Sequence, residues 1–286
     1  MLSPRFAHLL TSPVTMISQR VPDFWTKVIV HLHRPLIGHQ LLPIKHQGFQ
    51  IFVDPNDNCG GRLYYWGAYE SEQTQIFKTL LHELKPTAFL DIGANIGYYS
   101  LLAATHSTAH IYSFEPSPLI ADCLCRSVSA NHYGNRVTVV RKAASNASGK
   151  LSFFVNENPH NFGLGSMVNT VATSTELVVD CCLVDEELTD DVGPRVLCKI
   201  DVEGAELFAL QGMERLLRTS RPVLIVEVHP LELRKLGVSA RQVYDLLCDS
   251  GYTMSTPEHP KKAVEFESLP NDTNYWLLGR FTANTN

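Results

Sequence analysis

Short apolar segments that alternate with amphipathic segments constrain the fold of this chain more than any other feature. The apolar segments are rich in Val, Ile, Leu and Phe, which is typical of strands buried on both faces. They cover residues 88–92, 110–115, 137–141, 196–200 and 222–228. Ser117-Pro118 has the residues expected at a helix N-cap and first turn. We therefore predict an α/β fold with a mostly parallel sheet, helices on both faces, and a ligand site at the carboxyl ends of the strands.

The remaining segments extend this core in both directions. Residues 71–84 and 238–250 repeat apolar side chains at helical spacing. Additional strands are expected at 48–54, 151–155, 177–182 and 275–279. Residues 1–45 show no clear strand alternation, and we expect helices and loops there. The predicted division is an N-terminal helical extension at 1–47 and one main domain at 48–286.

The composition is typical of an ordinary globular protein without a basic surface. The 286 residues carry a formal net charge of −5, and no dense run of Lys and Arg provides the positive face that nonspecific binding to nucleic acid needs. Polar residues interrupt the apolar stretch 24–42, which is therefore not expected to span a membrane. The N-terminus lacks signal-peptide features, and seven cysteines without a Cys-x-x-Cys pair indicate reduced thiols. We expect a cytoplasmic protein with no integral membrane segment and no nucleic-acid partner.

A glycine-containing turn follows the first strand of the core. Its sequence is Asp91-Ile-Gly93-Ala-Asn95-Ile-Gly97, and glycine at such a turn lets a ligand approach the backbone closely. Glu115 ends the next strand, where a carboxylate can accept hydrogen bonds from both hydroxyls of a ribose. Each feature also has a structural explanation, because tight turns need glycine and strand-end carboxylates cap helices. Their occurrence together, in this order, predicts a nucleoside site.

The same residues indicate which nucleoside is bound. A dinucleotide site has a second glycine that lets the pyrophosphate approach, and Asn95 occupies that position here. Asp91 adds negative charge, which disfavours a pyrophosphate and favours a ligand that bears an ammonium and a sulfonium group. S-adenosylmethionine is such a ligand, and it carries a ribose for Glu115. We therefore expect S-adenosylmethionine as the cofactor.

Ionisable residues gather where the fourth core strand ends. Lys199, Asp201 and Glu203 occupy this position, and strand alternation places Lys199 and Asp201 on one face. Sites form at the carboxyl ends of parallel strands, so we expect Asp201 and Glu203 to be catalytic. Lys199 is expected to pair with a carboxylate or to orient the substrate. Glu206 is interpreted as an acid that the dipole of a helix N-terminus favours.

The fifth core strand ends in Glu227-Val-His229, whose two ionisable side chains point the same way. Histidine is the usual general base near neutral pH, and a hydroxyl needs a base because its own pKa lies far above neutral. His229 is therefore a candidate base, although a histidine before Pro230 fits a purely structural strand end equally well. Asp201, Glu203, Glu227 and His229 could instead hold Mg, Mn or Zn. No ligand spacing in the sequence is diagnostic, and we expect no metal.

These motifs together resemble those of the FkbM-type S-adenosylmethionine-dependent methyltransferases. The resemblance covers roughly residues 48–230 and is carried by Phe89-Leu-Asp-Ile-Gly-Ala-Asn-Ile-Gly-Tyr-Tyr-Ser-Leu, Phe114-Glu-Pro, Lys199-Ile-Asp-Val-Glu-Gly-Ala-Glu, Glu227-Val-His-Pro and Gly67-Ala-Tyr-Glu. It implies a Rossmann-like class I methyltransferase domain with a seven-stranded sheet whose last strand, 275–279, is antiparallel. It also implies methyl transfer to oxygen, typically to a hydroxyl of a sugar, a glycoside or another natural product.

The resemblance implies positions for the parts of the cofactor as well. It places the amino acid end of the cofactor near Asp91, Gly93, Asn95 and Gly97, and the ribose at Glu115. It places the adenine around Ala143 and Ala144, and it places Tyr69 and Glu70 over the methionine end. Residues 1–45 lie outside the resemblance, and no role is implied for them.

The sequence leaves the acceptor open. An O-methyltransferase acting on a small molecule is the leading interpretation. The alternatives are an N- or macromolecule-directed methyltransferase, a nicotinamide-dependent oxidoreductase, and a noncatalytic binding protein. Asp201-Val-Glu-Gly stands where amino-methylating enzymes carry Asn/Asp-Pro-Pro-Tyr, which favours oxygen, and Asn95 argues against a nicotinamide cofactor. Acceptor contacts are expected from residues 1–70 and from 156–176, and residues 156–174 have the polar composition of a lid.

Overall fold

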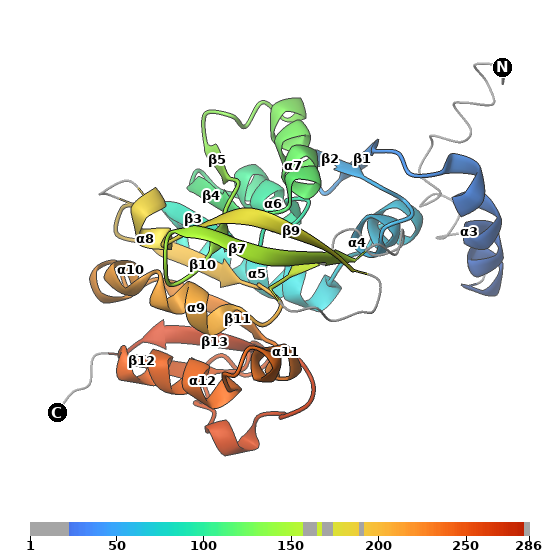
Figure 1. The fold of residues 1–286 in the computed structure, drawn as a ribbon. Coiled ribbons are helices and arrows are strands. Elements are labelled where there is room, and N and C mark those ends of the chain that lie inside the picture. The colour runs from blue at the N-terminus through green and yellow to red at the C-terminus, as the bar shows by residue number, and fades with distance from the viewer. Residues whose placement is uncertain (1–22, 157–164, 168–173, 189–191, 283–286) are drawn as a thin grey trace.

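A seven-stranded sheet with helices on both faces forms the centre of the computed structural model (Figure 1). The structure describes residues 23–156, 165–167, 174–188 and 192–282. The strands of this sheet, in spatial order, are β12 (Tyr252–Ser255), β13 (Tyr275–Phe281), β11 (Val223–Val228), β10 (Val196–Ile200), β3 (Ala88–Ile92), β4 (His110–Phe114) and β5 (Val137–Val140). All neighbours are parallel except the two pairs made by β13. The predicted mostly parallel α/β sheet and its antiparallel last strand are confirmed.

Helices pack on both faces because successive side chains of a buried strand point to opposite sides. Phe89 packs among the helices on one face, and Leu90 packs among those on the other. The first face carries α5 (Ser71–Leu84), α6 (Tyr98–His106) and α7 (Pro118–Ala130). The second carries α9 (Glu206–Gln211), α10 (Glu214–Thr219) and α12 (Ala240–Asp249). The same half of the chain also contains α8 (Val184–Glu187), α11 (Pro230–Lys235) and the 3-10 turn η2 (Phe266–Ser268).

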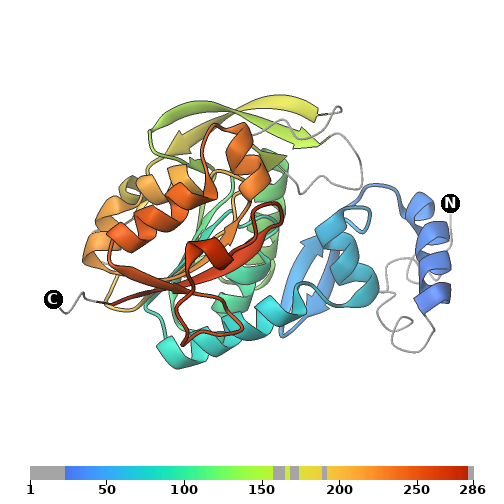
Figure 2. The same cartoon turned by 90° about the horizontal axis from the view of Figure 1, so that it is seen from below.

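The N-terminal part lies beside the sheet, at the opposite side of the molecule from the C-terminus (Figure 2). It contains α3 (Asp23–Ile37), β1 (Leu42–His46), β2 (Phe49–Val53), α4 (Asn58–Gly61) and the π-helical turn η1 (Arg62–Trp66). β1 and β2 form an antiparallel hairpin whose turn falls at the predicted boundary between 47 and 48. The expectation of helices and loops alone at 1–45 is wrong for β1, because Leu42 and Ile44 alternate inward and pack on the core.

A second, smaller sheet has the strand order β6-β9-β7-β8. It is formed by the chain segment in which the added strands were predicted. Its members are β6 (Ala143–Ala144), β7 (Gly149–Asn156), β8 (Gly165–Ser166) and β9 (Ser174–Cys182). β6 joins it to the end of β5, and its own small apolar cluster includes Phe153 and Val179. In Figures 1 and 2 the β7–β9 pair lies across one side of the molecule.

Two expectations concern segments that the structure covers only in part. Most of the predicted lid, 156–174, and residues 1–22 of the predicted extension lie outside the described residues. Among the described helices, none combines the length and the apolar composition needed to cross a membrane.

β12 was not expected from the sequence, because a four-residue edge strand after Gly251 gives too short a pattern to recognise.

Candidate active site

The turn between β3 and α6 has a backbone conformation that requires glycine. Gly93 and Gly97 have φ angles of 84° and 87°. A side chain on Gly93 would place its Cβ atom 1.9 Å from the backbone oxygen of Asp201. The turn after β3 therefore packs directly against the turn after β10. This close packing brings two of the predicted motifs together at the carboxyl edge of the sheet.

Glu115 lies at the end of β4 and bonds to the backbone through both carboxylate oxygens. Its Oε2 accepts a hydrogen bond from the N–H of Asn95 over 3.0 Å, and its Oε1 accepts one from the N–H of Ser117 over 2.8 Å. Burial raises the pKa of Glu115 to about 7, although these two donors act to lower it. The carboxylate therefore anchors the glycine turn and the start of α7. It also lines the cavity described next, where its remaining lone pairs can accept further hydrogen bonds.

One cavity, of about 240 Å³, lies at the carboxyl ends of β3, β4, β10 and β11. The predicted site residues that line it are Tyr69, Glu70, Gly93, Asn95, Glu115, Ala143, Ala144, Lys199, Asp201, Glu203, Glu227 and His229. The residues expected at the cofactor and those expected in catalysis thus face the same space. The parallel pairing of β10 with β3 and with β11 produces this arrangement, because it aligns the ends of three motif-bearing strands.

Asp91 and Gly97 were predicted at the cofactor, but neither lines this cavity. Asp91 is 1% exposed, and its Oδ2 accepts a 2.5 Å hydrogen bond from the hydroxyl of Ser100 on α6. Its Oδ1 has no hydrogen-bond partner within the described part of the chain. A side chain on Gly97 would collide with Leu124 of α7. Both residues therefore support the turn from inside the protein, because the strand alternation directs Asp91 toward α6.

Lys199 is a buried cation held between two aromatic rings. Its Nζ atom lies 2.8 Å from Oδ2 of Asp201, 4.9 Å from the centre of the Tyr99 ring and 5.6 Å from that of Trp276. Burial disfavours the charge of Lys199, but the carboxylates of Asp201 and Asp91 outweigh this effect and raise its pKa. Lys199 thus pairs with a carboxylate, which is one of the two roles expected for it, and holds Asp201 in a fixed orientation.

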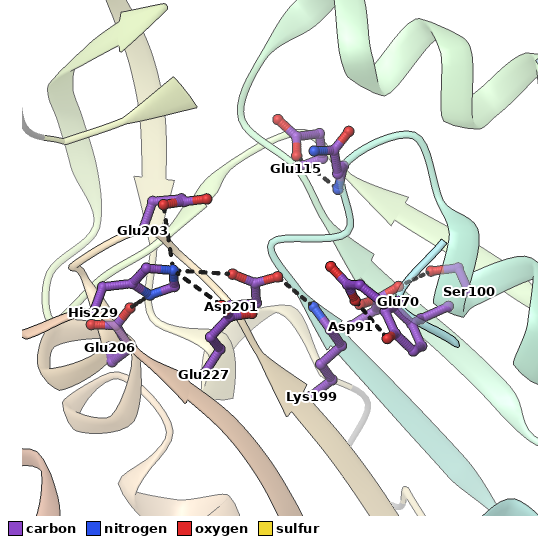
Figure 3. Close-up of polar contacts among 12 residues, drawn as sticks. Glu70, Asp91, Ser100, Glu115, Lys199, Asp201, Glu203, Glu206, Glu227 and His229 are labelled. Carbon is purple, nitrogen blue, oxygen red and sulfur yellow. Dashed lines mark hydrogen bonds and ion pairs between the residues drawn. The ribbon is translucent and has the colours of Figure 1, made fainter. Parts of the chain in front are cut away.

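His229 lies among four carboxylates (Figure 3). Its Nδ1 atom is 2.8 Å from Oε1 of Glu206, and its Nε2 atom is 3.4 Å from Glu203, 3.6 Å from Glu227 and 3.9 Å from Asp201. Glu206 therefore contacts one ring nitrogen, and the three carboxylates that line the cavity surround the other. The sequence placed Glu206 only at a helix N-terminus, and its contact with His229 was not predicted.

The carboxylates determine the charge of His229. Burial alone would lower its pKa, but the hydrogen bond and charge of Glu206, followed by the charges of Glu203 and Asp201, raise it to about 10. The ring is therefore cationic near neutral pH, which disfavours a neutral base at this position, and the role of His229 in catalysis stays a prediction. Burial raises the pKa of Glu203 to about 7 and that of Glu227 to about 8, against the charge of His229. These two carboxyl groups change charge near neutral pH.

Three cavity residues other than glycine have left-handed backbone conformations. The φ angles are 42° at Glu70, 51° at Asn95 and 49° at Glu203. Asn tolerates this region better than most residues, whereas Glu is uncommon there. Glu70 also accepts a 2.7 Å hydrogen bond from the hydroxyl of Tyr99, which fixes its carboxylate at the start of α5. Strained residues of this kind gather at functional sites when the surrounding packing holds them in place.

Acidic side chains outnumber basic ones in the cavity lining. The carboxyl groups are those of Asp57, Glu70, Glu115, Asp201, Glu203 and Glu227, and the permanent cations are Arg62 and Lys199. Such a lining fits a ligand that carries a sulfonium and an ammonium group, and it disfavours a polyphosphate. The buried carboxyl group of Asp91, whose Oδ1 has no hydrogen-bond partner among the described residues, lies beneath the turn. The donor set therefore fits S-adenosylmethionine.

Part of the same cluster has the geometry of a possible metal site. Asp201, Glu227 and His229 each offer one ligand atom, and these atoms lie within 4.8 Å of one another. Carboxylate oxygens and imidazole nitrogens suit several divalent ions. The expectation that the protein uses no metal stays a prediction.

Several lining residues were not predicted from the sequence. They are Asp57, Asn58, Cys59, Arg62, Tyr98, Tyr99, Ile120, Phe153, Met167 and Asn274. Asp57 gives a usable signal, since it caps α4 by accepting hydrogen bonds from Cys59 and Gly60. Phe153 and Asn274 reach the cavity through tertiary packing alone, and no local pattern marks them.

Comparison with protein families and relatives agrees with this geometry. The family model described as Methyltransferase FkbM domain matches residues 91–254. The hexuronic acid methyltransferase AglP of Haloferax volcanii is 28% identical over 210 residues, which cover 73% of this chain and 77% of that protein. Methyltransferase sdnD of Sordaria araneosa is 27% identical over 232 residues, which cover 68% of this chain and 87% of that protein.

Solved structures show more distant similarity. Methyltransferase FkbM from Methylobacillus flagellatus KT has a TM-score of 0.42 and 17% identity. That match covers 76% of this chain and 52% of the solved chain, so this chain spans about half the length of that protein. An O-methyltransferase from Bacillus cereus in complex with SAH has a TM-score of 0.44 and 14% identity, and the match covers 75% of this chain and 83% of that one.

Proposed function

This chain belongs to the FkbM methyltransferase family, and on that premise we propose that it transfers a methyl group to a hydroxyl of a small, sugar-like acceptor. One observation carries the proposal: a single cavity joins the glycine turn and Glu115 to the ionisable cluster around His229. A donor bound at the first end and an acceptor bound at the second would meet inside that cavity. Such positioning is the main requirement for a group transfer between two bound molecules.

The methyl donor is S-adenosylmethionine, which supplies an electrophilic methyl group on a sulfonium when it is bound. In our proposal Glu115 accepts hydrogen bonds from the ribose hydroxyls. Ala143 and Ala144 leave room for the adenine beside Phe153. Gly93 and Asn95, which line the cavity, contact the amino acid end of the cofactor through the backbone of the turn. The carboxylate of Glu70, which also lines the cavity, balances the positive charge of the ammonium group. Asp91 acts from below, through its negative charge.

The acceptor hydroxyl has to lose its proton as the new bond to carbon forms. We assign the role of general base to Glu203, because its pKa of about 7 lies near the working pH and its carboxylate lines the cavity. Glu227, with a pKa of about 8, is the nearest alternative on the neighbouring strand. His229 acts as a fixed cation between these carboxylates and does not take the proton itself.

Asp201 and Lys199 prepare the acceptor side. The charges of Lys199 and His229 lower the pKa of Asp201 despite burial, so this carboxylate is ionised near neutral pH. An ionised Asp201 can accept a hydrogen bond from a second hydroxyl of the acceptor and orient it. A polyhydroxyl compound such as a sugar offers such a group. The hexuronic acid methyltransferase from Haloferax volcanii supports a sugar-like acceptor.

A labelling experiment tests the proposal. The purified protein is incubated with S-adenosylmethionine that carries a ¹³C-methyl group and with a panel of neutral hexosides, hexuronic acid glycosides and amino sugars. We expect a new methyl ether carbon signal on one class of glycoside, and no signal with Glu203→Gln. Glu83→Gln is the matched control, because Glu83 is an exposed glutamate of α5 outside the cavity. A methyl group found on nitrogen would replace the proposed oxygen chemistry with the N-directed alternative.

A further inference from the structure

We propose that Glu206 is a positioning residue of this site: its buried carboxylate orients the His229 ring and holds a hydrogen on Nδ1, so that Nε2 faces the carboxylates of the cavity. The inference rests on the proposed function only for its catalytic consequence. The orientation and charge of the ring can be measured without any acceptor.

The contacts of Glu206 differ from those of an ordinary acid at a helix N-terminus. Its side chain is fully buried, and Oε1 accepts hydrogen bonds from Nδ1 of His229 over 2.8 Å and from the N–H of Gly204 over 2.9 Å. Because Oε1 already accepts the N–H of Gly204, its contact with Nδ1 fits a ring that carries a hydrogen on Nδ1 and donates it to Glu206. Oε2 has no hydrogen-bond partner among the described residues. The His229 ring is therefore the only charged group bonded to this carboxylate among the residues that the structure describes.

The neighbouring helix provides a direct comparison. Glu214 is the first residue of α10, as Glu206 is of α9, and both acids lie in a first helical turn. Glu214 is exposed and pairs with Arg218 one turn later on its own helix. A dipole-favoured acid therefore needs no burial. Removing a carboxylate from water is unfavourable unless it gains strong partners, and the partner that Glu206 gains is His229.

The groups that face His229 come from several elements. Glu206 of α9 meets Nδ1, and Asp201 and Glu203 from the turn after β10 and Glu227 of β11 meet Nε2. Lys199 of β10 lies behind Asp201. Tyr275 of β13 and Glu232 of α11 lie beyond these groups: the charge of Glu206 acts on Tyr275, and that of Glu232 acts on Glu203. Six of these are acids or phenols, and Lys199 is the remaining cation.

The fixed ring charge has a consequence for the cavity. The charge of His229 acts to lower the pKa of Asp201, Glu203 and Glu227, although burial raises the pKa of the two glutamates overall. Without the Glu206 carboxylate, the ring would lose its proton at a lower pH, and the cavity carboxylates would hold theirs to a higher pH. A buried acid that contacts no substrate would thereby control the pH at which the proposed base is ionised.

Nuclear magnetic resonance of the histidine rings tests this directly. The full-length protein is labelled with ¹⁵N-histidine, and the His229 signals among the twelve histidines are identified by their loss in His229→Gln. In the wild-type protein we expect protons on both ring nitrogens at pH 7, with titration only near pH 10. In Glu206→Gln we expect the titration midpoint to fall by about 1–3 pH units. Glu214→Gln should leave it unchanged.

Two results would overturn the inference. One is a neutral His229 ring at pH 7 in the wild-type protein, or a ring without a proton on Nδ1, and this measurement needs no variant to fold. The other is a Glu206→Gln protein that folds, as judged by its thermal melt, and titrates at the wild-type midpoint. Glu206→Asp keeps the charge, so its midpoint should lie closer to that of the wild type than the glutamine variant does.

The catalytic consequence is measured with the acceptor found in the labelling experiment. Glu206→Gln should lower kcat and move the rise of kcat with pH to higher pH, with the KM for S-adenosylmethionine changed less than about twofold. If only the KM for S-adenosylmethionine rises and the pH profile of kcat does not move, Glu206 has no positioning role. If no acceptor is methylated, the proposed function fails while the ring titration still decides the role of Glu206.

Discussion

The backbone N–H of Asn95 donates a 3.0 Å hydrogen bond to Oε2 of Glu115, and this bond ties the glycine turn after β3 to the end of β4. The carboxylate that we place at the ribose is thus also part of the turn that holds the amino acid end of the cofactor. Binding and local structure therefore depend on the same side chain, and a variant of Glu115 should affect both.

Glu115→Ala should weaken binding of S-adenosylhomocysteine by about 1–3 kcal/mol, the usual loss when buried hydrogen-bond partners are left unpaired. It should also lower the midpoint of thermal unfolding, because the N–H groups of Asn95 and Ser117 lose their acceptor. Isothermal titration and a thermal melt measure the two effects. Glu115→Gln retains one acceptor oxygen and should lie between the wild type and the alanine variant. Unchanged affinity with reduced stability would show that Glu115 is only an anchor of the turn.

Lys199→Met should destabilise the protein by about 3–5 kcal/mol, because it leaves the carboxylate of Asp201 in a largely buried position without its partner. Methionine is one heavy atom shorter than lysine and keeps most of its aliphatic stem, so the effect reports mainly on charge. Urea unfolding at pH 7 gives the free energy. Lys150→Met is the matched control, since Lys150 pairs with Asp180 in an exposed position and should change stability little. Equal effects of the two variants would contradict the role of Lys199.

The rate of methyl transfer should rise with pH through about 7. Burial raises the pKa of Glu203 to this value, and a carboxyl group accepts a proton only when it is ionised, so activity increases above that pKa and falls below it. Glu203→Gln should lower kcat by about 10²–10⁴-fold, the range for a general base. Profiles of kcat against pH between 5.5 and 9 test this. If Glu227→Gln removes the rise and Glu203→Gln does not, the base is Glu227.

Activity should survive treatment with a chelator such as EDTA. The expectation follows from the proposed acid-base chemistry, in which Glu203 takes the proton of the hydroxyl without a Lewis acid. The measurement compares initial rates before and after dialysis against the chelator, followed by addition of Mg²⁺ or Mn²⁺. Lost activity that the ions restore would instead make Asp201, Glu227 and His229 the ligands of a metal.

Much of the fold was predictable because its signals are local. The runs 88–92 and 196–200 are apolar throughout, and the turn residues that follow them mark the carboxyl ends of the strands. The parallel pairing of β10 with β11 then follows the general rules of α/β sheets, and it places His229 beside Asp201 as expected. The S-adenosylmethionine cofactor and the methyltransferase family were predictable from the same motifs.

The rest of the site depends on tertiary packing, which no local pattern encodes. Glu206 has the sequence position of a helix-start acid, and only burial against His229 distinguishes it from Glu214. Asp91 has the sequence position of a ligand-binding residue, but its side chain turns toward Ser100. The charge of His229 depends on tertiary packing for the same reason. It is set by the carboxylates of Glu206, Glu203 and Asp201, and their distances from the ring are known only once the chain is folded.

The left-handed backbone at Glu70 and Glu203 has an evolutionary consequence. Each such residue costs about 1–3 kcal/mol relative to a relaxed backbone, and glycine would remove most of that strain. Selection for stability alone would therefore replace both glutamates, and only the chemistry of their side chains opposes the replacement. In duplicated genes that have lost the activity, these two positions should drift to glycine early. Glycine at both would then identify a copy that has ceased to be an enzyme while keeping its fold.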